Sequence, residues 1–283
     1  MDGSARLFPR SAGVLLPVSS LPSPYGIGSF GRIARKWIDF LHEAGQSYWQ
    51  ILPLGPTGYG SSPYQCFSAF AGNPYFIDLD TLCEEGLLVE SEYKYFIWGA
   101  SESQVDYGAV HRHREAVLRK AFARFTDESA LDTFIADNPW FDEYGLFTAI
   151  KADQGQLSWE EWETPLRQHL PEAVEAVRSR LAEDIRYHAF VQYQFYRQWL
   201  ALRAYANVRD IQIIGDIPIY VSLDSADAWA NHSLFQLGDK AYPVEVAGCP
   251  PDSFSKEGQL WGNPLYNWED MASRGYPWWM LRL

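Results

Sequence analysis

The stretch that most constrains the fold is residues 211–221, Ile-Gln-Ile-Ile-Gly-Asp-Ile-Pro-Ile-Tyr-Val. It begins as an apolar run rich in β-branched residues, a pattern typical of a strand that is covered on both faces. A carboxylate, Asp216, lies near the end of the run, and Pro218, which has no N–H, marks where ladder pairing should stop. Folds of the α/β class place their chemistry at the carboxyl ends of such strands. Asp216 is therefore a candidate functional residue, with a turn-capping carboxylate as the alternative.

Two further apolar runs, at residues 12–18 and 48–54, are predicted to be strands. Between them apolar residues recur at spacings of three and four, which predicts a helix that Ser29 could cap and Gly45 could end. Strand, helix and strand within about forty residues match the length of a parallel crossover unit. The order of elements therefore indicates the first part of a (β/α) barrel or a doubly wound sheet.

The remaining segments are longer and less regular. Residues 55–73 form a long loop without regular structure of its own, and loops of that length in compact domains tend to be functional. Charge rises and helical patterns dominate between about residues 80 and 180. A strong amphipathic pattern over about residues 184–206 predicts a helix that is buried on more than one side. Pro277, near the last residue of the sequence, is placed as in the first turn of a helix.

Composition excludes several classes of partner and site. The formal net charge of −13 argues against a nucleic-acid backbone or an anionic membrane. Cys66, Cys83 and Cys249 are widely spaced, which favours a reduced, cytoplasmic setting. We recognise no signal peptide and no membrane-spanning run. We also find no metal-binding motif and no phosphate-binding glycine motif, so no metal and no cofactor are predicted. The aromatic share of 16% fits either a bulky core or stacking platforms for flat-faced ligands.

Four stretches together resemble the 4-α-glucanotransferases, also called amylomaltases or disproportionating enzymes, of glycoside hydrolase family 77. They are Gly-Val-Leu-Leu-Pro-Val-Ser-Ser-Leu-Pro-Ser at residues 13–23, Trp-Gln-Ile-Leu-Pro-Leu-Gly-Pro-Thr-Gly-Tyr-Gly-Ser-Ser-Pro-Tyr-Gln at 49–65, Ile-Ile-Gly-Asp-Ile-Pro-Ile-Tyr-Val at 213–221 and Pro-Pro-Asp-Ser-Phe-Ser-Lys-Glu-Gly-Gln-Leu-Trp-Gly-Asn-Pro-Leu-Tyr at 250–266. Their order matches that of the family, and the resemblance covers nearly the whole chain.

The resemblance implies an α/β protein of the α-amylase-type (β/α)8 barrel family, here with about the first three β/α units and helical insertions. One interrupted catalytic domain is expected. Residues 1–80 would hold the first two barrel strands and an active-site loop, and residues 81–183 a mostly helical insertion. Residues 184–283 would hold the third strand, a covering loop and the start of the next helix.

The implied reaction moves an α-1,4-glucan segment from one maltooligosaccharide to the 4-hydroxyl of another, or to glucose. The family retains anomeric configuration by using one carboxylate as nucleophile and a second as acid/base. The nucleophile lies in an Arg-Ile-Asp-His-Phe-Arg-type motif that this sequence lacks. No catalytic residue is therefore assigned in this chain; both carboxylates are expected beyond Leu283, and the chain on its own is expected to be inactive.

The resemblance also implies glucan-binding residues. Tyr64 matches a tyrosine that stacks under the sugar at the cleavage point, and Ser62 matches a neighbouring polar contact. Tyr59 matches a tyrosine of a second glucan-binding spot. Asp216 matches an aspartate that orients the donor sugar, and Trp261 matches an aromatic on the mobile loop that closes over the glucan.

Each of these assignments has an alternative. Tyr64 and Trp261 would also suit core aromatics, Tyr59 an ordinary loop residue, and Asp216 a purely structural carboxylate. At the level of the whole chain, the alternatives are a non-catalytic half-barrel that binds maltodextrin, and a hydrolase or phosphorylase of the same clan.

Overall fold

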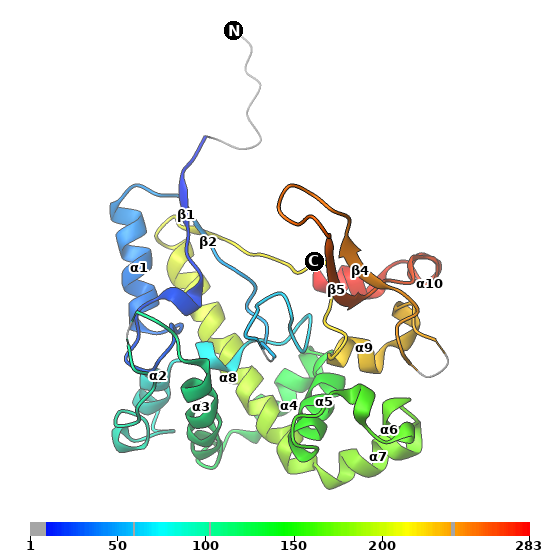
Figure 1. The fold of residues 1–283 in the computed structure, drawn as a ribbon. Helices are drawn as coiled ribbons and strands as arrows, with labels where there is room; N and C mark the ends of the chain where they lie inside the picture. The colour runs from blue at the N-terminus through cyan, green and yellow to red at the C-terminus, as the bar shows by residue number, and fades with distance from the viewer. Residues whose placement is uncertain (1–9, 59, 102, 239–240) are drawn as a thin grey trace. The chain divides into compact units, whose positions relative to one another are not determined.

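The computed structural model describes residues 10–58, 60–101, 103–238 and 241–283, and its contacts divide the chain into two compact units (Figure 1). The first unit comprises Met1–Pro53, Tyr75–Arg124 and Gln194–Ile217, and the second comprises Leu54–Pro74, Phe125–Tyr193 and Pro218–Leu283. Each unit is therefore assembled from three separate stretches of sequence. In the described residues, no helix is both long and apolar enough to cross a membrane.

A three-stranded parallel sheet lies in the first unit. Its strands are β1 (Gly13–Leu15), β2 (Tyr48–Gln50) and β3 (Gln212–Ile214), in the spatial order β1-β2-β3. Val14 pairs with Trp49, and Trp49 pairs with Ile213. All three predicted strands are thus present, each shorter than the apolar run that predicted it, and the parallel arrangement follows from the helical crossovers between them.

The two faces of this sheet differ in burial. Trp49, which is paired with Val14 and Ile213 on one face, is 0% exposed, and its indole N–H donates to the carbonyl of Leu16 at 2.8 Å. On the other face, Leu15 is 53% exposed and Ile214 is 43% exposed. The prediction that the strand from residue 211 is covered on both faces is therefore wrong in this structure, because side chains alternate across a strand and only one face is packed.

Helix α1 (Arg32–Glu43) connects the first two strands. The prediction that Ser29 caps it is wrong, since its N-cap is Gly31 and the Ser29 hydroxyl donates to a carboxylate oxygen of Asp78 at 2.7 Å. A Cβ on Gly31 would collide with that same carboxylate. The predicted end is confirmed, because Gly45 adopts a φ of +67° just after the helix, a conformation that glycine tolerates best.

Helix α8 (Ala182–Asn207) is the long amphipathic helix predicted before β3, and it contributes to both units. Two of its glutamines each bind both the N–H and the carbonyl of a single residue. In the second unit, Gln192 accepts from the Gly72 N–H at 2.8 Å and donates to the Gly72 carbonyl at 2.9 Å. In the first unit, Gln198 accepts from the Asp78 N–H at 2.7 Å. These buried amides satisfy backbone groups that no strand reaches.

The other elements are mostly helical. The helices are α2 (Leu79–Glu84), α3 (Tyr107–Phe122), α4 (Glu128–Asp137), α5 (Phe141–Asp153), α6 (Thr164–Arg167), α7 (Pro171–Arg180), α9 (Ala226–Ala230), α10 (Trp268–Ser273) and α11 (Pro277–Arg282). Short 3-10 turns occupy Val18–Ser20, Pro74–Phe76, Glu90–Glu92, Trp159–Glu161 and His232–Leu234. Pro277 opens α11, as predicted. Two antiparallel strands, β4 (Val246–Cys249) and β5 (Gln259–Pro264), form a hairpin in the second unit.

An ion pair in the first unit predicts a defined pH dependence. Arg124 binds both carboxylate oxygens of Glu92, at 2.7 and 3.0 Å, and holds the pKa of that carboxyl at about 2. The pKa is thus lower in the folded state than in the unfolded chain, so the pair stabilises the fold above about pH 4.5 and the contribution disappears as pH falls towards 2. We expect Glu92→Gln to lower the unfolding free energy by about 1 kcal/mol at pH 7. Urea denaturation of the variant and of the unchanged chain, at pH 7 and at pH 2, measures this difference in unfolding free energy.

The matched control is Glu115→Gln, which removes an exposed pair with Arg119 one helical turn away. This variant should change the unfolding free energy by less than the Glu92 variant. If Glu92→Gln lowers the unfolding free energy as much at pH 2 as at pH 7, the stabilisation does not come from the ionised Glu92–Arg124 pair.

Candidate functional site

The loop at residues 55–73, in the second unit, is ordered by its own hydrogen bonds. Thr57 and Cys66 form an isolated antiparallel bridge, and the Phe67 N–H donates to the Pro56 carbonyl at 3.0 Å. The described residues of this loop contain no helix or strand, so the expectation of a loop without regular structure is confirmed, with this one isolated bridge where the chain folds back on itself. A Cβ on Gly55 would lie 2.6 Å from the Cys66 sulfur, so this close approach requires glycine.

Tyr64 and Ser62 share the turn at the tip of this loop. The Tyr64 N–H donates to the Ser62 hydroxyl at 3.3 Å, and the Gln65 N–H donates to the Ser62 carbonyl at 3.1 Å. The Tyr64 side chain is 45% exposed, so the alternative of a buried core aromatic is not what the structure shows. Behind the turn, burial raises the pKa of the Cys66 thiol to about 12, which keeps it protonated and unreactive.

Trp261 lies on β5 of the hairpin and is 44% exposed. Where the resemblance implied a covering loop, Val246–Cys249 and Gln259–Pro264 form a bulged hairpin. Gly258 and Gly262 adopt φ angles of +74° and +77°, a region that glycine tolerates best, and so allow the chain to bend there. The Trp261 indole N–H donates to the side-chain oxygen of Gln259 at 3.0 Å, so one edge of the ring is fixed while much of the ring stays accessible.

A buried asparagine joins the loop to the hairpin. Asn263 is 5% exposed; its side-chain nitrogen donates to the Val221 carbonyl at 2.7 Å, and its oxygen accepts from Gln65 at 3.4 Å. Gln65 directly follows Tyr64, and Asn263 lies two residues after Trp261 on β5. The structure therefore brings the loop of Tyr64 and Ser62 and the strand of Trp261 to one site.

An aromatic cluster contacts the hairpin through the ring of Trp261. The rings of Tyr220 and Tyr266 are stacked with centroids 6.1 Å apart, and Tyr220 lies 6.3 Å from the Trp261 ring. The Tyr266 hydroxyl donates to the Ile219 carbonyl at 2.8 Å. Burial raises the pKa of Tyr266 to about 12, so this phenol remains a hydrogen-bond donor at any physiological pH.

A second buried polar residue, Asp227 of α9, fixes the far end of the loop. One of its carboxylate oxygens accepts from the Ala69 N–H at 2.7 Å, and the other accepts from the indole N–H of Trp278 at 3.0 Å. The neighbouring Ala226 N–H donates to the Phe67 carbonyl at 2.9 Å. Burial raises the pKa of Asp227, since the ionised form loses water. Its two hydrogen bonds connect the loop to both α9 and α11.

Two further residues, Asp216 and Tyr59, were predicted to bind glucan. Asp216 belongs to the first unit, where it lies two residues after the end of β3 and is partly buried. Tyr59 lies outside the described residues. Within the described ranges, no group of three or more His, Cys, Asp or Glu side chains could hold a metal ion.

Sequence reasoning missed Asn263, Gln65, Tyr220 and Asp227. Gln65, Tyr220 and Asn263 lie inside the stretches that carried the family resemblance, and this was the signal that could have identified them. Their contacts could not be predicted from their spacing along the sequence. Asp227 lies in the Ala226–Ala230 helix, whose short pattern gave no indication that its carboxylate is buried.

The first unit contains a parallel sheet and the second contains a loop and a hairpin that expose aromatic rings, so the chain is a mixed α/β protein. The chain belongs to the 4-alpha-glucanotransferase family, glycoside hydrolase family 77, whose sequence model matches residues 16–283. The predicted resemblance is thereby confirmed.

Individual relatives agree with this family. The chain is 49% identical over 279 residues to a 4-alpha-glucanotransferase of Streptococcus pneumoniae, covering 97% of this chain and 55% of that protein. It is 47% identical over 270 residues to a 4-alpha-glucanotransferase of Clostridium butyricum, covering 94% of this chain and 55% of that protein. The amylomaltase of Streptococcus agalactiae, solved in complex with acarbose, has a TM-score of 0.94 at 43% identity, covering 97% of this chain and 56% of that structure. The chain thus spans a little over half the length of these relatives.

Proposed function

We propose that this chain provides the glucan-binding portion of a 4-alpha-glucanotransferase. The complete reaction transfers α-1,4-glucan segments between maltooligosaccharides, or to glucose, with retention of configuration. Within these 283 residues we assign binding and orientation of the glucan, and no catalytic carboxylate. The observation that carries the proposal is the link between Gln65 and Asn263, which fixes two accessible aromatic side chains, Tyr64 and Trp261, on neighbouring elements.

The chemistry of this site suits a sugar. A pyranose ring presents a flat apolar face, which packs on an aromatic ring, and a rim of hydroxyls, which hydrogen-bond. Tyr64 and Trp261 supply the rings, and Ser62 supplies a neutral hydroxyl. We assign Tyr64 to stacking, Trp261 to covering the bound glucan, and Asp216 to orienting the donor sugar. Tyr59 is assigned to a second glucan-binding spot away from the active centre.

We further propose that β1, β2 and β3 are the first three strands of an α-amylase-type (β/α)8 barrel. The half-exposed Leu15 and Ile214 support this, because in a closed barrel the inner face is filled by side chains of other strands. Residues 81–183 would then be a helical insertion in one interrupted catalytic domain. The three widely spaced cysteines support a cytoplasmic location, and the net charge of −13 supports the assignment of neither nucleic acid nor membrane as a partner. Maltooligosaccharides and glucose are the partners that the family membership supports.

A second candidate function is a half-barrel that binds maltodextrin without chemistry. It is favoured by the lack of an Arg-Ile-Asp-His-Phe-Arg-type motif in the sequence. The two functions share the binding site and differ only in turnover, so an assay of turnover separates them.

The binding assignment predicts a specific effect of Tyr64→Ala. Because this side chain is 45% exposed, its removal should leave the fold intact and remove one stacking surface. We expect the affinity for acarbose or maltoheptaose to fall about tenfold, which corresponds to about 1.4 kcal/mol. Isothermal titration calorimetry measures it.

Tyr95→Ala is the matched control, since Tyr95 is 80% exposed and lies in the first unit. The affinity of Tyr95→Ala for acarbose or maltoheptaose should equal that of the unchanged chain. If both variants bind equally well, the assignment of Tyr64 as a stacking platform is wrong.

A further inference from the structure

A buried lysine of α5, Lys151, lies next to the loop at residues 55–73 and is a charged group that the site described above does not use. Its side chain is 3% exposed, and its ammonium donates to a carboxylate oxygen of Asp224 at 2.6 Å and to the Leu157 carbonyl at 3.0 Å. The same nitrogen lies 5.0 Å from the centre of the Phe67 ring, on that loop. All of these residues belong to the second unit. An ammonium group taken out of water needs such partners, because its desolvation is costly.

The ring of Phe67 connects Lys151 to the turn that carries Tyr64. A Cβ on Gly58 would lie 3.1 Å from the Phe67 ring, so this ring packs closely against the opposite arm of the loop. The Gly58 N–H donates to the Gln65 carbonyl at 3.4 Å, and Gln65 directly follows Tyr64. A cation over an aromatic ring is attracted to the face of that ring. The charge of Lys151 therefore acts on the side chain that packs both arms of the loop together.

Asp224 connects the same lysine to the start of α9. The next residue, Ser225, is buried and caps α9 through its hydroxyl. The Ala226 N–H, in the first turn of that helix, donates to the Phe67 carbonyl at 2.9 Å. Phe67 is thus held at two points, by its carbonyl from α9 and by its ring from α5. The ion pair of Lys151 with Asp224 joins these two points.

We propose that Lys151 is a positioning residue for glucan binding: its ammonium fixes the Phe67 ring and thereby the turn that presents Ser62 and Tyr64. The link to glucan rests on the proposed function, whereas the fixing of the loop rests on the contacts alone. Methionine is unbranched and fills a similar space, so packing by itself does not require a charge at this position. The ammonium adds direction, because its N–H groups donate to partners at fixed places.

The test compares Lys151→Met, which keeps the shape of the side chain and removes its charge, with the unchanged 283-residue chain. Hydrogen exchange read by mass spectrometry should show the amides of residues 62–70 exchanging about tenfold faster in the variant, while those of α3 in the first unit keep their rates. Isothermal titration calorimetry should show an affinity for acarbose that is about fivefold lower. In a Tyr64→Ala background the same substitution should change the affinity by less than about twofold, because both substitutions act on one stacking contact.

A double variant keeps the test decisive if Lys151→Met folds poorly. Lys151→Met leaves the Asp224 carboxylate without its ammonium partner, whereas Lys151→Met combined with Asp224→Asn removes both charges. The Leu157 carbonyl still accepts from the Trp162 indole N–H at 3.3 Å. The double variant should therefore fold, and it should reproduce the faster exchange of the loop and the weaker binding of acarbose.

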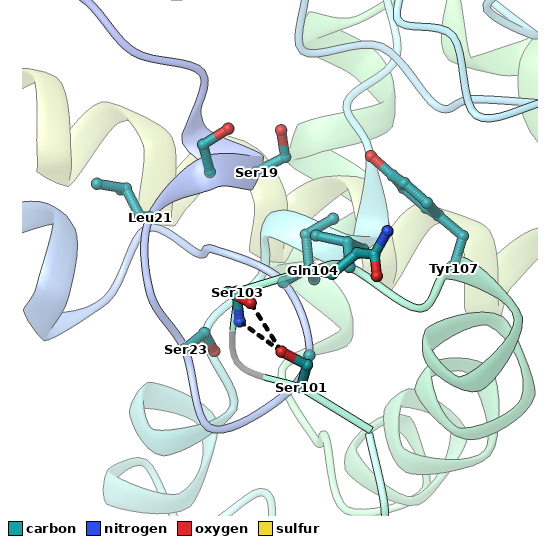
Figure 2. Close-up of a pocket in the computed structure, with 11 residues that line it drawn as sticks. Ser19, Leu21, Ser23, Ser101, Ser103, Gln104 and Tyr107 are labelled. Atoms are coloured by element: carbon teal, nitrogen blue, oxygen red, sulfur yellow. Dashed lines mark hydrogen bonds between the residues drawn. The ribbon is translucent and has the colours of Figure 1, made fainter. Parts of the chain in front are cut away.

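Leu21→Ala is the control for a general loss of stability. Leu21 is 4% exposed and lines a pocket of the first unit (Figure 2). A large-to-small substitution at a buried position destabilises a fold. Its urea midpoint should fall, while its affinity for acarbose and the exchange of residues 62–70 should match those of the unchanged chain.

The outcomes separate this inference from the proposed function. Exchange of residues 62–70 that is unchanged in both Lys151 variants, or that rises equally in α3, would overturn the positioning role. Losses of affinity that simply add to that of Tyr64→Ala would overturn it as well, as would unchanged affinity in variants of Lys151 when Tyr64→Ala binds less tightly. If Tyr64→Ala alone binds acarbose as tightly as the unchanged chain, the proposed function fails, and the exchange rates still decide whether Lys151 fixes the loop.

Discussion

Replacing Asp227 with alanine is expected to lower the free energy of unfolding by about 2–4 kcal/mol. The substitution leaves the Ala69 N–H and the Trp278 indole N–H without an acceptor, and each unsatisfied buried donor costs about 1–3 kcal/mol. The total is reduced because the variant no longer buries a carboxylate, whose pKa is raised by desolvation. Urea denaturation followed by tryptophan fluorescence measures the loss.

Asp252→Ala is a close control for this variant. The Asp252 carboxylate also accepts two N–H groups, from Phe254 at 2.8 Å and from Ser255 at 2.7 Å, but it lies on the exposed hairpin. Water can replace it there, so we expect a loss of less than about 1 kcal/mol. Equal losses in the two variants would show that the Asp227 contacts add nothing beyond an ordinary surface turn.

Asp227→Ala should also weaken glucan binding, because Ala69 and Tyr64 lie on the same loop. Assayed well below the urea transition, the folded variant should bind acarbose less tightly than the unchanged chain, while Asp252→Ala should bind normally.

A Trp278→Phe variant removes the indole donor alone. If Asp227 acts through Trp278, the effects of the two substitutions on stability will be non-additive.

The 283-residue chain incubated with maltotriose is expected to release no glucose and to form no longer oligomers. Retention by double displacement needs two carboxyl groups about 5–5.5 Å apart. The family resemblance places the nucleophile in a motif that this sequence does not contain. The expected loss of turnover is complete, since binding groups alone do not supply the covalent intermediate.

The assay needs a positive control and a check for contamination. The Streptococcus pneumoniae relative, which is 49% identical, should disproportionate maltotriose under the same conditions. Activity of this chain that survives repurification and disappears in Tyr64→Ala would contradict the prediction. Activity that is unaffected by Tyr64→Ala would instead indicate a contaminating enzyme.

Much of the fold followed from local pattern. Periodicity identified the three strands, α1 and α8, because side-chain alternation and helical spacing are properties of neighbouring residues. Pro277 marked the opening of α11, and Gly45 marked the end of α1, where it adopts a positive φ. The family resemblance located Tyr64, Ser62 and Trp261, which the structure places on a joined loop and hairpin.

The errors share one physical cause. Ser29 has the right position for a helix cap, but Asp78, forty-nine residues away, competes for its hydroxyl. The two strands of the hairpin were not predicted, because glycine and proline interrupt the alternating pattern that marks a strand. In each case the outcome depended on which groups meet through tertiary contact.

By itself, the sequence determined the family, the parallel strand-helix order and the aromatic and hydroxyl side chains of the proposed glucan-binding site, since these depend on residue type and local spacing. Only the tertiary structure decided which face of the sheet is covered, and that Asn263 and Asp227 hold the loop in place. Hydrogen bonds between residues that lie about 160–200 positions apart leave no periodic trace along the chain, so only the folded arrangement reveals them.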